Sequence, residues 1–500
     1  MSDLVATTEP GRDREGAVAR ISPGIGYGSA ILGPSAAPAA GVRARRLPWP
    51  VGCVLLFFFL VTAFGKGPTY LGLPPLYISE MALGVGLLWL IDTEGVSRTF
   101  WPEHSVMVAL LACLLLLGSL ILITDVGKGI EAFRDAAMWY YGLFFYIGYR
   151  LARDPMGDRV WRILCVAWAC ALVWGTFDQV TLRLTGVAPS TFGPTLPWRG
   201  EKLLFNSTNE LVEHMMLATL ILFNPRLHRG QFGLWRLPLT LVSVAALAEV
   251  AVSRGRGVKV GVALSVLLLV ALRFAPGKAL TASRRVAAAA VLAVVVSVGG
   301  LAFYTDEFLR LTQLDRFAHA DPSSASGTAY WRLVWWKRLW TVVNEQNPAF
   351  GLGFGDSLNI YNPYLHGDEN NKWPVRSPHN YNVTVFARMG YVGAALWASI
   401  LVMGLAGLFR RAWRGRAPDG ELYSEERRDE IAFWISVMII TWINATFGVL
   451  MEGPVLGPWF WLALGLGWAR SSTSGRVRSA RQAAIRTELT FRPSYGGVIA

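Results

Sequence analysis

Three separate segments carry basic side chains that could act on a phosphate-containing substrate. They are the turn Ser253-Arg254-Gly255-Arg256-Gly257, the stretch around Arg332, and the run that ends in His379. An arginine guanidinium can bind phosphate oxygens through two parallel hydrogen bonds and stays charged at any accessible pH. A neutral histidine can take a proton from a hydroxyl. These residue types can therefore hold an anionic leaving group and activate a nucleophile.

The composition indicates the solvent in which those segments work. Hydrophobic residues make up 53% of the chain and charged residues only 16%, whereas a soluble chain carries about 25% charged residues. The net charge is +13, but lysine and arginine are spread between apolar runs, which argues against nucleic acid as a partner. The cysteines fall inside apolar runs and predict no disulfide framework and no metal site. They are Cys53, Cys113, Cys165 and Cys170.

Apolar runs long enough to cross a bilayer recur along the chain. A hydrocarbon core about 30 Å thick needs roughly 20 apolar residues per helix. The pattern predicts an all-α integral membrane protein with about twelve transmembrane helices. The clearest runs are 48–65, 105–124, 159–177, 236–252, 258–274, 285–304 and 383–409, and the weaker ones are 75–91, 136–151, 209–224, 430–450 and 455–469.

Positive charge predicts the orientation, because short cytoplasmic loops are rich in lysine and arginine. Arg43, Arg45 and Arg46 precede the first span, which places the amino terminus in the cytoplasm. Alternate connections and the carboxyl tail then fall on the same side, and they too are rich in arginine. The expected organisation is a disordered cytoplasmic tail (1–47), transmembrane helices one to nine (48–304), a large, partly helical extracytoplasmic loop (305–380), helices ten to twelve (381–470) and a basic cytoplasmic tail (471–500).

The large loop between helices nine and ten contains a tryptophan-rich stretch. From Thr328 to Glu345 the pattern fits an amphipathic helix in the membrane interface, with several tryptophans at headgroup depth. Its cations lie on a side where topology disfavours them, so we interpret them as substrate-binding. The tryptophans are Trp331, Trp335, Trp336 and Trp340, and the cations are Arg332, Lys337 and Arg338. Glycines 351, 353 and 355 follow Asn347-Pro348 without a nucleotide-binding pattern and predict a tight turn.

Arg254 and Arg256 could simply snorkel to the membrane surface, but their outer position favours a functional role. Three other polar sites are weaker candidates. Glu213 and His214 lie with Glu210 in an apolar run, where ionisable groups are expensive and often line a cavity. Lys202 and Arg199 precede that run and could receive phosphate, and Arg134 with Asp135 predicts a simple ion pair.

Taken in order, three motifs resemble the O-antigen ligase and polymerase superfamily, also called Wzy-C. They are Ser253-Arg254-Gly255, then Arg332 with NPAFGLGFG behind it, then His379 followed by Gly390 and Gly393, and the resemblance covers roughly residues 200–405. It implies an inverting glycosyltransferase of the bacterial inner membrane that uses no metal and no cofactor. Its partners would be membrane lipids, a glycan donor linked to undecaprenyl pyrophosphate, and a glycan or lipid-core acceptor.

The resemblance also implies roles for individual residues. Arg254 and Arg332 would hold the pyrophosphate, and His379 would activate the acceptor on the extracytoplasmic, periplasmic side. Neighbouring guanidiniums should lower the pKa of His379 and keep it neutral.

Several alternatives stay open at this point. Ligases, polymerases and protein O-oligosaccharyltransferases share a donor site, so the motifs do not separate them. A secondary transporter would also suit about twelve helices, but no internal repeat is evident and the notable residues gather at the outer surface. A metal-dependent oligosaccharyltransferase would carry acids in its first outer loop, and the stretch from Lys66 to Pro75 has no carboxylate.

Overall fold

Helices form nearly all of the regular structure in the described part of the chain. The computed structural model describes residues 47–73, 76–154, 156–196, 202–204, 208–252, 256–273, 325–362, 377–418, 420–448 and 450–472. All of them lie in the unit Leu47–Ala500. The expected tails, the run 285–304 and Arg254 fall outside the described residues.

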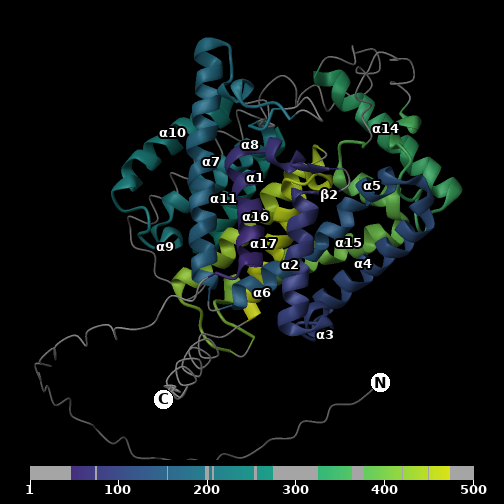
Figure 1. The fold of residues 1–500 in the computed structure, drawn as a ribbon, viewed down its shortest axis with the longest axis horizontal. Coiled ribbons are helices and arrows are strands. Elements are labelled where there is room, and N and C mark those ends of the chain that lie inside the picture. The colour runs from purple at the N-terminus through teal and green to yellow at the C-terminus, as the bar shows by residue number, and fades with distance from the viewer. Residues whose placement is uncertain are drawn as a thin grey trace, which may run out of the picture. The chain divides into compact units, whose positions relative to one another are not determined.

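Most of the helices lie in the apolar runs of the sequence, and Figure 1 shows how they are arranged. They are α1 (Trp49–Phe64), α2 (Ile78–Glu94), α3 (Val96–Phe100), α4 (Val106–Asp125), α5 (Ile130–Tyr140), α6 (Phe144–Arg153), α7 (Gly157–Thr185), α8 (Thr208–Phe223), α9 (Pro225–His228), α10 (Arg236–Val252), α11 (Arg256–Arg273), α14 (Ala325–Gln346), α15 (Tyr381–Arg414), α16 (Glu425–Thr446) and α17 (Leu456–Ser472).

Short elements join these helices. Single turns of 3₁₀ helix occur at η1 (Gly67–Tyr70), η2 (Val126–Lys128), η3 (Tyr141–Leu143), η4 (Pro189–Phe192), η5 (Gly233–Trp235), η7 (Leu358–Tyr361) and η8 (Leu450–Glu452). Strands β1 (Gly72–Leu73) and β2 (Leu76–Tyr77) form a small antiparallel pair that the sequence did not predict. The segment 136–151, which was predicted as one helix, is divided into α5, η3 and α6.

Several of the helices suit a lipid environment. Among the described residues, four helices are long and apolar enough to cross a membrane, namely Val106–Lys128, Gly157–Thr185, Gly233–Val250 and Tyr381–Arg414. Large apolar side chains stay exposed on α4 and α10, for example Leu116, Leu120, Leu237 and Leu241. Such surfaces are unfavourable in water and normal against lipid. A mostly helical membrane protein is therefore confirmed, and the count of about twelve spans stays a prediction.

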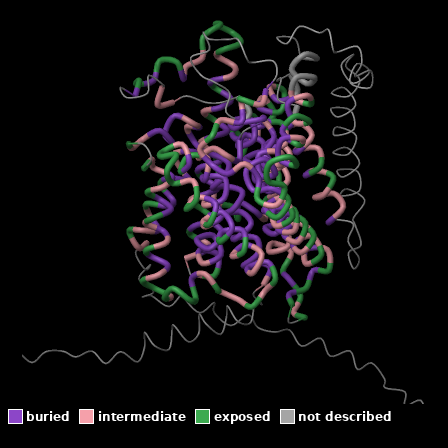
Figure 2. The backbone as a smooth tube through the Cα atoms, turned by 90° about the vertical axis from the view of Figure 1, so that its right-hand side faces the viewer, coloured by how far each residue is buried: buried purple, intermediate pink, exposed green. Residues whose placement is uncertain are grey.

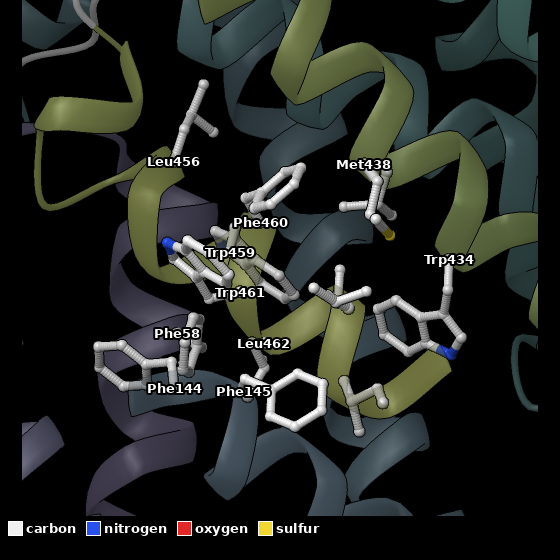
Figure 3. Close-up of a cluster of buried hydrophobic side chains, with 14 of the residues drawn as sticks. Phe58, Phe144, Phe145, Trp434, Met438, Leu456, Trp459, Phe460, Trp461 and Leu462 are labelled. Atoms are coloured by element: carbon white, nitrogen blue, oxygen red, sulfur yellow. The ribbon is translucent and has the colours of Figure 1, made fainter. Parts of the chain in front are cut away.

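Aromatic side chains fill the centre of the bundle. Figure 2 shows the buried positions gathered in the middle and the exposed ones along the outer helices. In Figure 3, residues Trp459 to Leu462 of α17 lie among aromatic side chains from α1, α6 and α16. Phe58 meets the Trp459 ring edge-on with centroids 4.8 Å apart, a favourable arrangement for aromatic pairs. The α17 helix is thus the buried centre around which the other helices pack.

Ion pairs connect several loops at one end of the bundle, which we call the ionic end. Arg229 binds Asp158 at 3.0 Å and Glu430 at 3.5 Å, and Arg470 binds Glu430 at 2.9 Å. These residues come from the start of α7, the end of α9, the first turns of α16 and the end of α17. Arg226 extends the network to Asp429 at 3.5 Å. Basic connections that are far apart in the sequence therefore meet at the amino-terminal end of α16.

Candidate functional site

The three sequence motifs approach one another at the opposite end of α16. This helix has 22 residues and is therefore about 33 Å long, close to the thickness of a bilayer core. Its first turns belong to the ionic end. Its last turn and the following residue, Phe447, contact α11 and α14, and it is linked to the start of α15. We call this region the motif end.

The first motif reaches the motif end through Gly257. A Cβ atom at Gly257 would lie 3.1 Å from the Phe447 ring and 3.2 Å from the Asn444 Cα, so glycine allows α11 to begin directly against α16. Arg256 is the first residue of α11, and its side chain is outside the described part. Arg254 precedes it by two positions. The described residues of this turn, Arg256 and Gly257, therefore bring the start of α11 to the motif end.

The second motif is tied to the same turn by Arg332. Its Nη1 donates to the carbonyl oxygen of Phe447 at 3.2 Å. Burial lowers the pKa of this guanidinium, although arginine remains a cation at neutral pH. A cation is therefore fixed beside the last turn of α16.

His379 of the third motif lies close enough to Arg332 for the arginine charge to lower its pKa. Burial, and secondarily the charge of Arg332, lower the pKa of His379 from 6.5 to about 4. The sequence had identified only the second of these causes. The imidazole is consequently neutral at pH 7 and can accept a proton.

The short segment 377–380, which we call the histidine strap, is held on two sides. Trp336 Nε1 donates to the carbonyl oxygen of Pro378 at 2.7 Å. Ser377 Oγ donates to Glu452 Oε1 at 2.7 Å. At its end, Asn380 Oδ1 accepts from the Asn382 and Val383 amides and so caps α15. The position of His379 therefore depends on α14, η8 and α15 together.

A break in α15 explains the glycine-rich turn that follows α14. Gly390 has φ 61 and interrupts the helix, which leaves main-chain groups that need other partners. The turn supplies them. Leu352 N donates to Ala387 O at 2.8 Å, and Tyr391 N donates to Pro348 O at 2.8 Å. The predicted tight turn is confirmed, with positive φ at all three of its glycines, 351, 353 and 355.

A buried ion pair that the sequence did not predict fixes this turn from the other side. Arg388 Nη2 lies 2.7 Å from Asp135 Oδ2, and Arg388 Nη1 donates to Gly353 O at 3.0 Å. The predicted pair of Arg134 with Asp135 is wrong, because Arg134 lies 3.7 Å from Glu131 instead. A signal was available, since Arg388 is a lone charge in an apolar run, and such a charge usually has a specific partner.

Glu213 supports the motif end from within the bundle. It is buried, and its Oε2 accepts from Asn444 Nδ2 at 3.1 Å while its Oε1 accepts from Thr441 Oγ1. Both carboxylate oxygens therefore bind the last turns of α16. The neighbouring His214 is also buried and packs against the Trp459 ring, with centroids 6.1 Å apart. Their predicted role in binding substrate stays a prediction.

The remaining predicted cations lie elsewhere. Lys337 and Arg338 are exposed on α14. At 100° per residue they are turned about 140° and 240° from Arg332. Lys202 donates from Nζ to Thr195 Oγ1 at 2.8 Å, beside η4. No described contact joins these three side chains to His379.

The tryptophans of α14 divide into two groups. Trp335 is fully buried among Leu339, Val343 and Leu358, so its ring packs inside the protein, and its depth in the membrane stays a prediction. A core position explains this, because the helix packs its Trp335 face against η7 and α15. Trp340 is exposed and stacks on Phe386, with centroids 4.6 Å apart.

No group of three or more histidine, cysteine or acidic side chains in the described ranges is arranged to hold a metal ion.

Comparison with known proteins gives one family. Residues 241–398 match the family model described as O-antigen ligase. The matched segment contains all three motifs, and it ends within α15. No curated protein matches the chain. The match confirms the resemblance found from the motifs.

Proposed function

We propose that this chain, related through residues 241–398 to the O-antigen ligase and polymerase superfamily, transfers a glycan from undecaprenyl pyrophosphate to an acceptor hydroxyl. The family supports an O-antigen ligase-like membrane enzyme. The donor, the acceptor and the residue roles are our inference. The observation that carries them is the placement of a partly buried, neutral histidine beside a partly buried arginine, brought together from different elements at one end of α16.

The proposed reaction is a single displacement at the anomeric carbon. The acceptor oxygen forms the new glycosidic bond while its proton passes to His379. The bond from the anomeric carbon to the pyrophosphate breaks, and its electron pair leaves with the diphosphate. Arg332 stabilises that developing charge, a contribution of about 10² to 10³ in rate for a well-placed donor. A general base adds about 10² to 10⁴.

The sidedness of the reaction follows from the two ends of α16. The ionic end gathers arginines from several connections, and short cytoplasmic loops carry such an excess. We therefore place the ionic end and both termini in the cytoplasm, and the motif end on the periplasmic face of the inner membrane. A polyprenyl-linked donor would then reach Arg332 from the outer leaflet.

Two substitutions test this function. Arg332→Ala and His379→Ala should each abolish transfer in membranes that contain lipid-linked donor, while the protein stays folded and inserted. Arg183→Ala is the matched control, because Arg183 lies near the other end of α7 from the ionic end and forms an ion pair with Glu249. Normal surface glycan from either site variant would refute the proposal. Product analysis after deletion separates the two roles we favour: unattached polymer on the carrier indicates a ligase, and single repeat units on the core indicate a polymerase.

A further inference from the structure

We propose that Trp336 is a positioning residue that holds His379 in its working place through the main chain of the histidine strap. The inference rests on the proposed function for its catalytic meaning. Its structural part, the control of His379 by Trp336, can be measured without any transfer reaction.

The geometry of α14 supports this role. Arg332 and Trp336 are four residues apart, so their side chains share one face of the helix. From that face Arg332 places its charge near His379, and Trp336 donates to the carbonyl of Pro378, the residue directly before His379. One helical face thus sets both the electrostatics and the position of the imidazole.

The main-chain conformation of His379 explains why neighbouring hydrogen bonds are needed to keep it in position. His379 has φ 56, in the left-handed region that residues with a side chain rarely adopt. Such a conformation persists only where surrounding contacts determine it, and it is found disproportionately at functional sites. The hydrogen bond from Trp336 fixes the peptide group just before this residue. On the other side, Glu452 accepts from both Ser377 and Thr384 at 2.7 Å.

The neighbouring Trp335 provides an internal comparison. Its Nε1 also donates to a carbonyl oxygen, that of Leu358, at 3.1 Å. However, Trp335 is fully buried in an apolar cluster and its acceptor belongs to η7. The hydrogen bond of Trp335 therefore stabilises the packing of α14 on η7, whereas the hydrogen bond of Trp336 holds the histidine strap.

The experiment compares Trp336→Phe with Trp335→Phe in the full-length protein in detergent or nanodiscs. Each substitution removes one N–H donor and keeps an aromatic ring. Trp336→Phe should lower kcat by about tenfold to a hundredfold, the range expected for a misplaced catalytic group, with little change in KM for the donor. Trp335→Phe should lower the Tm and leave kcat per folded molecule near that of the parent.

A titration of His379 followed by NMR gives a readout that does not require transfer. In the parent, the imidazole should titrate near 4, with Arg332 and Glu452 as the charged or titratable groups on the elements packed against the strap. Trp336→Phe should move this titration toward 6.5, because a released strap exposes the ring to water. Trp335→Phe should leave it in place.

The outcomes separate the two proposals. An unchanged kcat and an unchanged His379 titration in folded Trp336→Phe would overturn the positioning role. Normal transfer by His379→Ala would instead overturn the proposed function and leave the titration result intact. If Trp336→Phe does not fold, Glu452→Ala loosens the strap from the other side, and it should shift the titration in the same direction. No shift in that variant would also count against a held strap.

Discussion

The ionic end and the motif end use arginine in different ways. At the ionic end burial lowers the pKa of Arg229, but Asp158, Glu430 and Glu426 outweigh it and raise the pKa overall. At the motif end burial lowers the pKa of Arg332. The first end is stabilised by its own carboxylates. The second holds a partly buried cation, which an anionic substrate would stabilise further. This difference supports our proposal that the motif end is the functional end of the bundle.

The largest expected effect on transfer comes from replacing the arginine of the motif end with lysine, compared with the same replacement at the ionic end. Arg332→Lys should recover little transfer, a loss of about 10² or more, because a point charge cannot replace a bidentate guanidinium. Arg229→Lys should keep most of the activity per folded molecule. Equal losses of transfer in the two variants would break the comparison between the ends.

The next largest effect is expected on stability, from the Arg388–Asp135 ion pair that holds the glycine-rich turn. Arg388→Met should destabilise the protein by about 3–5 kcal/mol, because it removes the arginine that neutralises the largely buried Asp135 carboxylate. The double variant with Asp135→Leu should regain part of the loss, as expected when two residues are coupled. Thermal unfolding in nanodiscs measures both. If the stability losses of the two single variants simply add in the double variant, the Arg388–Asp135 ion pair does not hold the glycine-rich turn in place.

The pH dependence of transfer has a direction fixed by His379. Its pKa is lowered from 6.5 to about 4, so the base stays neutral as the pH falls to about 5 and becomes protonated below that. Activity should therefore persist at pH 5 and decline near pH 4. Glu452, whose pKa burial raises to about 7, titrates in a higher range. A profile in which activity is lost only above pH 8 would count against histidine as the base.

Glu452 also predicts a change in stability with pH. Its folded-state pKa lies above the usual 4.5, so its contribution is complete below about pH 4.5 and is lost as the pH rises through about 7. Glu452→Gln should flatten this part of the stability curve. Unfolding measured between pH 5 and 8 tests it, and an unchanged slope in Glu452→Gln would contradict a raised pKa for this carboxyl.

The smallest effect is expected at the surface of the ionic end. Arg226→Ala should cost only about 0–1 kcal/mol, because a partly exposed ion pair is screened by solvent. Unfolding at low and high salt would measure it. If Arg226→Ala lost as much unfolding free energy as Arg388→Met, the distinction between the exposed ion pair of Arg226 and the Arg388–Asp135 ion pair would fail.

The sequence predicted the helices better than the contacts between them. Apolar runs identify membrane helices because each must satisfy its own main chain in lipid, so α4, α10 and α15 were found close to their observed bounds. The contact of Arg332 with Phe447 joins residues 115 positions apart, and no local pattern encodes it. The buried place of Trp335 was missed for a similar reason, since its partners come from η7 and α15.

The most direct measurement is a structure of the protein with bound polyprenyl pyrophosphate in nanodiscs. The account predicts the diphosphate at the motif end, with its oxygens within hydrogen-bonding distance of Arg332 and the His379 ring facing the side from which the acceptor enters. A diphosphate bound at the ionic end, or at a site that neither residue reaches, would contradict the account.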